Sequence, residues 1–146
     1  MRSPYTKLYV HCVWATWDRQ PFLTPPVEAR LYGAISAKCH ALRCEAIAIG
    51  GDLDHVHLLA RYVPALSIAE LVQEVKGCSS HLINHEIASH REFRWQGSYG
   101  AFTVSPGGVK KVADYIHNQK LHHAERRTFD EWERCYQEEE ATGQPQ

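Results

Sequence analysis

The pattern of apolar and polar positions along the chain predicts four strands. Residues 5–16 are rich in β-forming side chains and carry bulky groups on both faces, which is typical of a strand covered on two sides. Residues 45–49 and 55–62 are predicted to form an antiparallel hairpin with a turn at Gly50-Gly51-Asp52. A fourth strand is predicted over residues 101–105.

Apolar residues at helical spacing predict three helices that alternate with these strands. They cover residues 24–42, 67–88 and, at most, 106–127. The second helix begins at Ser67-Ile68-Ala69-Glu70, which matches a capping box. The resulting order β-α-β-β-α-β-α predicts an α+β fold, a ferredoxin-like antiparallel sheet with helices on one face and a short C-terminal helix.

The length of 146 residues suits one domain. We predict that this domain covers residues 1–127, and that residues 128–146 form an acidic helix, beginning at a second capping-box pattern (Thr128-Phe129-Asp130-Glu131), and a disordered tail. The chain contains neither a long apolar run nor a signal peptide, and its five cysteines form no C-x-x-C pair. These features predict a cytoplasmic protein with reduced thiols and no membrane partner.

Charge is distributed unevenly along the chain. Acidic residues are concentrated beyond Phe129, where Arg134 is the only basic residue, so the preceding part of the chain is mildly basic. A basic body permits a polyanionic partner such as nucleic acid, although an excess of this size is also common in proteins that bind none.

Two histidines, His55 and His57, lie one residue apart inside a predicted strand. Because side chains alternate faces along a strand, both imidazoles point to the same side. Such a pair can bind a metal ion, but it fills only part of a coordination shell and requires further ligands. A His-x-His pair taken alone is more often incidental.

The last core helix carries a possible partner for this pair. Tyr115 and Gln119 lie four residues apart, so they share one side of the helix, away from the apolar stripe. The glutamine amide oxygen could coordinate a hard divalent cation beside the tyrosine hydroxyl. Helices carry such pairs often, so this spacing alone is weak support for a site.

Taken together, these motifs resemble those of the HUH endonucleases. Asp54-His55-Val56-His57 is similar to their His-hydrophobic-His motif, and Tyr115-Ile116-His117-Asn118-Gln119 is similar to the tyrosine helix of the single-tyrosine transposases of insertion sequences, which are related to REP-associated tyrosine transposases. Further similarities lie within residues 9–14, 71–80 and 95–105. The resemblance extends over residues 5 to 136.

The resemblance implies a transposase that cleaves and rejoins single-stranded DNA at the hairpin-marked ends of an element. Tyr115 would attack a phosphodiester and form a 5′-phosphotyrosine intermediate, without a nucleotide cofactor. His55, His57 and Gln119 would hold Mg²⁺ or Mn²⁺. Asp54 would orient one of these ligands, although it could equally be a turn residue.

The same resemblance implies a homodimer whose active sites are shared between subunits. Members of the family join their sheets through the first strand, where Tyr9, His11 and Val13 are predicted to be free for a ligand or a second subunit. The candidate DNA-binding residues are Lys76, His81, Arg94, Lys110, Lys111 and Lys120. Lys76 and His81 could instead belong to a solvated helix face.

Two other hypotheses remain open at this point. A domesticated transposase could retain the fold as a non-cutting module that binds single-stranded nucleic acid. An unrelated metal hydrolase, in which Tyr115 is incidental, would act without a covalent adduct.

Overall fold

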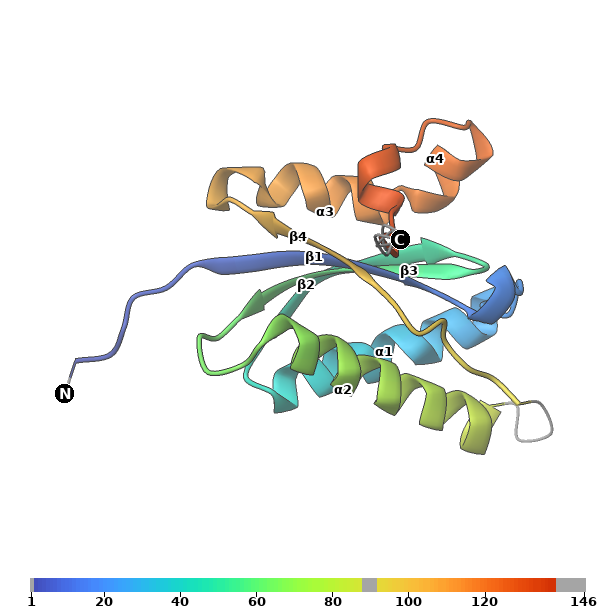
Figure 1. Ribbon diagram of the computed structural model, residues 1–146, viewed down its shortest axis with the longest axis horizontal. Helices are drawn as coiled ribbons and strands as arrows, with labels where there is room; N and C mark the ends of the chain where they lie inside the picture. The colour runs from blue at the N-terminus through green and yellow to red at the C-terminus, as the bar shows by residue number, and fades with distance from the viewer. Residues whose placement is uncertain (1, 88–91, 139–146) are drawn as a thin grey trace, which may run out of the picture.

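The computed structural model describes residues 2–87 and 92–138 of the chain (Figure 1). The tail that the sequence predicts to be disordered lies mostly at residues 139–146, outside this described part.

The centre of the fold is a four-stranded antiparallel sheet. Its strands are β1 (Leu8–Ala15), β2 (Glu45–Asp52), β3 (His55–Tyr62) and β4 (Gly100–Val104), in the order β2-β3-β1-β4. The register places Val13 of β1 opposite His57 of β3. This arrangement confirms the predicted α+β, ferredoxin-like sheet.

Helices cover both faces of the sheet (Figure 1), so the prediction that they lie on one face is wrong. One face packs against α1 and α2, and the opposite face packs against α3 and α4. The helices are α1 (Pro25–Ala41), α2 (Ile68–Leu82), which continues into a π-helical turn at Ile83–Ile87, α3 (Val109–His117) and α4 (Gln119–Ala124).

The alternation of side chains along β1 and β3 separates two apolar cores. Val56 and Leu58 belong to the larger core beneath the sheet with α1 and α2, whereas Leu59 packs with Val112 and Ile116 on the α3 side. The histidine pair is therefore carried on the α3 side.

Helix boundaries follow the sequence signals at α2 but not at the C-terminal end. The Ser67 hydroxyl accepts a hydrogen bond from the Glu70 backbone N–H (3.0 Å), as the capping box predicts. The helix predicted up to residue 127 is instead interrupted at Asn118, where φ is −102° and ψ is 21°. The prediction of a capping box at Thr128-Phe129-Asp130-Glu131 is also wrong. Phe129 precedes a 3₁₀ turn at Asp130–Glu133, and no side chain caps this turn.

The predicted turn at Gly50-Gly51-Asp52 is also wrong, because β2 continues through these residues to Asp52 and the hairpin turns at Leu53 and Asp54. The reason is a close approach of α3 to β2. A Cβ at Gly50 would overlap the carbonyl oxygen of Ile116 and lie 3.0 Å from its Cγ2. Gly50 is therefore a packing glycine in a strand.

Residues 128–138 fold back against the sheet rather than forming a separate acidic helix. Trp132 packs on the α3-side core, and Cys135 is 3 % exposed beside Val13. The carbonyl oxygen of Arg134 occupies the space where a Cβ on Gly100 would lie. This segment is thus part of the same packed body as the sheet.

Candidate active site

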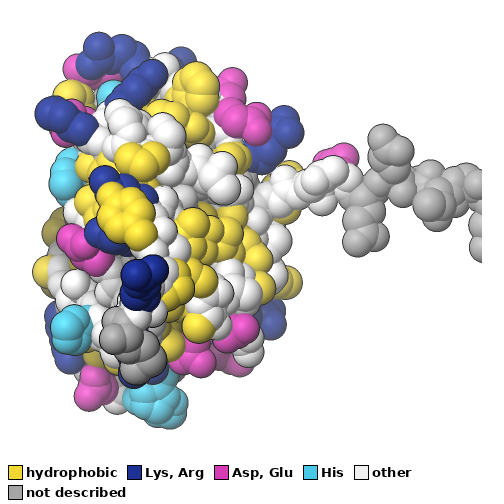
Figure 2. All heavy atoms as spheres, turned by 90° about the vertical axis from the view of Figure 1, so that its left-hand side faces the viewer, with side chains coloured by type: hydrophobic (Ala, Val, Ile, Leu, Met, Phe, Trp, Pro, Cys, Tyr) yellow, Lys and Arg dark blue, Asp and Glu magenta, His cyan; other side chains and the backbone are white. Residues whose placement is uncertain are grey.

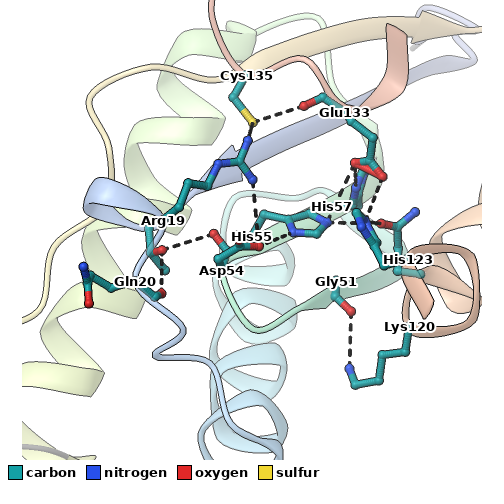
Figure 3. Close-up of polar contacts among 12 residues, drawn as sticks. Arg19, Gln20, Gly51, Asp54, His55, His57, Lys120, His123, Glu133 and Cys135 are labelled. Atoms are coloured by element: carbon teal, nitrogen blue, oxygen red, sulfur yellow. Dashed lines mark hydrogen bonds and ion pairs between the residues drawn. The ribbon is translucent and has the colours of Figure 1, made fainter. Parts of the chain in front are cut away.

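His55 and His57 project from β3 toward α3 and α4 (Figure 3). His57 is fully buried and His55 is 2 % exposed. The Nδ1 atom of His55 lies 2.8 Å from a carboxylate oxygen of Asp54, the last residue of the hairpin turn. This hydrogen bond lowers the pKa of Asp54, and an ionised carboxylate can only accept, so Nδ1 carries a proton and Nε2 faces the site.

A third histidine, His11 of β1, lies behind His57. His11 Nε2 and His57 Nδ1 are 2.8 Å apart, and His11 is fully buried. Burial, reinforced by neighbouring His57, lowers the pKa of His11 to about 3, so its imidazole is neutral. If His11 accepts a hydrogen bond from His57 Nδ1, that nitrogen carries the proton and His57 Nε2 has the free lone pair. If His11 donates instead, His57 Nε2 carries the proton.

His11 should therefore control metal affinity without contacting the ion. His11→Ala is expected to weaken Mn²⁺ binding by about 10–100-fold, the usual effect of removing a residue that orients a ligand. Calorimetric titration of the variant checks this, with His40→Ala on α1 as a control, since His40 is exposed and far from the site in the fold. Equal affinities for wild type and His11→Ala would contradict the role.

Tyr115 and Gln119 lie on either side of the break at Asn118, and both reach the histidine pair. Gln119 is 1 % exposed, and its Oε1 atom lies 3.1 Å from His55 Nε2. The Tyr115 hydroxyl donates to Glu133 (2.9 Å) and accepts from the backbone N–H of Phe129 (2.9 Å). Burial raises the pKa of Tyr115, so its phenol is neutral near pH 7.

Glu133, in the 3₁₀ turn that follows the last helix, lies in the middle of these groups (Figure 3). Its Oε2 atom is 2.7 Å from His57 Nε2 and 3.7 Å from His55 Nε2, and its Oε1 atom is 3.1 Å from His123 Nε2. Burial opposes ionisation of this carboxyl, but the hydrogen bond from His57 and the charge of the neighbouring imidazoles outweigh it and lower the pKa of Glu133 to about 2.

The donor atoms brought together here fit a divalent metal ion. One ligand atom from each of His55, His57 and Glu133 lies within 4.8 Å of the others. The amide oxygen of Gln119 lies beside the imidazole of His55. Nitrogen and oxygen donors in this combination suit ions such as Mn²⁺ or Mg²⁺.

The sequence alone identified neither Glu133 nor His123 as members of this site. His123 follows Gln119 by four residues, and its Nε2 atom lies 2.9 Å from the Gln119 amide oxygen, so helical spacing was an available signal. Glu133 had no comparable signal, because it lies in an irregular segment among several other acidic residues.

Three of the lysines predicted to contact DNA already have partners in the protein. Lys76 donates to the Gln96 carbonyl (2.7 Å), and burial lowers its pKa. Lys110 pairs with Asp114, and Lys120 pairs with Glu28. Figure 2 shows a face on which basic side chains alternate with acidic and apolar ones, without a continuous basic patch.

The other three predicted DNA contacts are distributed over separate parts of the fold. The Arg94 guanidinium lies 4.0 Å from the centre of the Trp17 ring, at the edge of a cavity of about 440 Å³. Lys111 is exposed on α3. His81 is exposed on α2, with its ring 4.2 Å from that of His85.

The predicted dimer-interface residues do not form a free surface. His11 and Val13 are fully buried within the chain, and β1 pairs with β3 on one edge and with β4 on the other over residues 9–13. The prediction that these residues are free for a second subunit is therefore wrong for His11 and Val13. β1 is an interior strand, and a central strand offers no edge for pairing with another sheet.

Within the described residues, no helix is long and apolar enough to span a bilayer.

The four-stranded sheet thus presents a buried histidine pair to the helix that carries Tyr115. A family model described as "Transposase IS200 like" matches residues 4–119, and the chain belongs to this family. Comparison with curated proteins gave no significant match.

Solved structures similar to the chain include the following two. A protein from Deinococcus radiodurans R1, provisionally described as a transposase, is 29 % identical with a TM-score of 0.64, over 82 % of this chain and 95 % of that one. A REP-associated tyrosine transposase bound to a REP hairpin is 17 % identical with a TM-score of 0.63, over 84 % of this chain and 73 % of that one. The second similarity concerns the fold alone.

Proposed function

We propose that this transposase cleaves and rejoins single-stranded DNA through a covalent bond to Tyr115. The observation that carries the proposal is the position of the Tyr115 hydroxyl. It lies 2.9 Å from a carboxylate that also contacts both histidines of β3. A nucleophile held beside a group of side chains that can bind a metal ion is suited to metal-assisted phosphodiester cleavage.

His55, His57 and Gln119 would hold the divalent ion, either Mg²⁺ or Mn²⁺. When bound, such an ion polarises the scissile phosphate and stabilises its developing charge. Asp54, which accepts a hydrogen bond from His55 Nδ1, and His11, which is hydrogen-bonded with His57 Nδ1, orient the two imidazoles.

The reaction at Tyr115 exchanges one phosphodiester for another. Its hydroxyl oxygen forms a bond to phosphorus as the bond from phosphorus to the 3′ oxygen breaks, leaving a 5′-phosphotyrosine and a free 3′-hydroxyl. Attack by the same or another 3′-hydroxyl reverses the exchange and restores the phenol. No nucleotide cofactor is required, because the protein–DNA bond conserves the bond energy.

We infer that the substrate is single-stranded DNA carrying a hairpin. The similar REP-associated transposase is bound to such a hairpin, and its fold matches this chain. Arg94 and Lys111 are the best placed of the predicted Lys and Arg contacts with DNA, since neither side chain forms an ion pair or a hydrogen bond among the described residues, whereas Lys76, Lys110 and Lys120 do. The stacked Trp17 and Arg94 side chains also offer a surface for an unpaired base.

The test is a covalent-adduct assay. Purified protein is incubated with 5′- or 3′-labelled hairpin DNA from the sequence that flanks its gene, with Mn²⁺, Mg²⁺ or EDTA. We expect a metal-dependent adduct that survives denaturation and whose DNA-bearing peptide contains Tyr115. DNA binding without an adduct would instead support the non-cutting module, and turnover without an adduct would support an unrelated hydrolase.

We further propose that one chain completes its own active site, even if the protein forms the homodimer that the family resemblance implies. Tyr115 and Gln119 contact His55, His57 or Glu133 of the same chain. Mixing Tyr115→Phe protein with His57→Ala protein should therefore restore no cleavage. Recovery of activity in the mixture would indicate sites shared between subunits.

A further inference from the structure

We propose that Glu133 is a fourth side-chain ligand of the divalent ion, beside His55, His57 and Gln119, and that the same carboxylate positions Tyr115 beside it. The inference rests on the proposed metal-dependent function and deepens it. It assigns to the segment after the tyrosine helix a role in building the metal site.

The two oxygens of the Glu133 carboxylate face different groups. Oε2 lies 2.7 Å from His57 Nε2 and 3.7 Å from His55 Nε2, the nitrogens that face the site. Oε1 lies 2.9 Å from the Tyr115 hydroxyl. One carboxylate therefore joins the histidine pair to the nucleophile, and this contact orients the hydroxyl toward the histidine side of the site.

The position of Glu133 is fixed by packing on both sides of it. Trp132 contacts the rings of Tyr115 and His11, with centroid distances of 5.0 and 5.7 Å. Cys135 is buried against the sheet beside Val13. These anchors hold the carboxylate in the site, unlike a surface acid on a mobile chain.

Gly100 has no Cβ, and this leaves room for a further contact between this segment and the sheet. The Arg134 carbonyl, one residue after Glu133, fills the space beside β4 where a Cβ would lie. The backbone on the C-terminal side of Glu133 is thus seated directly on the sheet, and its approach depends on glycine at this position.

The surroundings of the carboxylate favour a cation over hydrogen bonds alone. The Glu133 side chain is only 17 % exposed and faces the imidazoles of His55, His57 and His123, which offer it a positive charge only when they are protonated. A buried carboxylate is stable only when its charge is compensated. A divalent ion held by both neutral imidazoles would supply that charge, with Gln119 as an additional oxygen donor.

This donor set makes a prediction about metal choice. Two imidazoles, a carboxylate and an amide oxygen favour Mn²⁺ over Mg²⁺, which prefers an oxygen-rich shell with several waters. The set also leaves coordination positions open for a phosphate oxygen.

Metal binding tests the assignment independently of DNA cleavage. Mn²⁺ affinity of the full-length chain is measured by electron paramagnetic resonance and calorimetry for wild type, Glu133→Gln and Glu133→Ala. We expect Glu133→Ala to bind Mn²⁺ about 100-fold more weakly, since even residues that only support a ligand cost about 10–100-fold. Glu133→Gln should lie between, because its amide oxygen is a weaker donor.

Glu131→Gln is the matched control, because Glu131 is an exposed acid in the same 3₁₀ turn. It should bind Mn²⁺ like wild type. Thermal unfolding without metal verifies that each variant is folded, and the increase in Tm on adding Mn²⁺ should be lost in Glu133→Ala but kept in Glu131→Gln.

Unchanged Mn²⁺ affinity in both Glu133 variants would overturn the inference. If those variants also cleaved DNA faster than wild type, the carboxylate would be an obstacle that occupies the place of the DNA phosphate. Either result would leave the proposed function intact, provided that wild type forms the Tyr115 adduct. Absence of both Mn²⁺ binding and adduct in wild type would overturn the inference together with the proposed function.

Discussion

Replacing Tyr115 by phenylalanine is expected to abolish the covalent DNA adduct and to reduce strand cleavage by about 10⁴-fold or more. The substitution removes the attacking oxygen, and loss of a catalytic nucleophile typically has an effect of this size. Denaturing electrophoresis of labelled DNA after a single turnover measures both quantities.

The rest of the site should remain in place in this variant. The Tyr115 ring packs against His122 at 4.9 Å and Trp132 at 5.0 Å, and phenylalanine retains these contacts. The variant loses the hydrogen bonds to Glu133 and to the Phe129 N–H, which should lower the free energy of unfolding by about 1–2 kcal/mol. Mn²⁺ binding should persist, because His55 and His57 are unchanged.

Tyr136→Phe is the matched control for this experiment. Tyr136 is 55 % exposed and lies in the same C-terminal segment as Glu133, so its hydroxyl should be dispensable. The variant is expected to cleave at the wild-type rate. An adduct that persisted in Tyr115→Phe would show that another residue is the nucleophile.

The histidine half of the site could be predicted because strand geometry is local. A residue pair two apart in a strand shares a face whatever the rest of the chain does, and His55 and His57 follow that rule. The proximity of Tyr115 and Gln119 to each other followed in the same way from helical spacing. Their proximity to the histidines depended on the family resemblance, because local periodicity does not determine which face of a sheet a helix covers.

The rest of the site could not be predicted because it depends on long-range packing. His11 had the expected strand alternation, but the strand order that places it behind His57 is not encoded in the β1 sequence itself. Glu133 enters the site from a 3₁₀ turn that lacks any periodic pattern. Its position becomes evident only once Trp132 and Cys135 are seen to be seated against the sheet.

The glycines of β2 show that a glycine can indicate a local turn or can be required by tertiary packing. A Gly-Gly-Asp sequence between two β-rich runs is a strong turn signal. Here Gly50 is instead required by the close approach of α3, since Ile116 occupies the space over its Cα. The same close approach brings Tyr115, the neighbour of Ile116, to the histidine pair.

Gly50→Ala is therefore expected to impair both folding and catalysis. The added Cβ would overlap the Ile116 carbonyl, a backbone group that can move only if α3 moves with it. Overpacking of this kind typically lowers the free energy of unfolding by about 1–3 kcal/mol. Displacement of α3 would also carry Tyr115 from its position, and a shift of about 1 Å in a reacting group can reduce the rate by about 10²-fold.

Gly33→Ala separates this packing effect from a general response to losing a glycine. Gly33 lies in α1, and nothing lies within 4 Å of the position its Cβ would take. This variant should be as active as wild type and about 0.5–1 kcal/mol more stable, because alanine is the better helix former. Urea unfolding and single-turnover cleavage, measured on both variants, test the comparison. Wild-type stability and activity in Gly50→Ala would contradict this prediction. They would show that a Cβ fits between β2 and α3, and that the position of Tyr115 does not depend on glycine at residue 50.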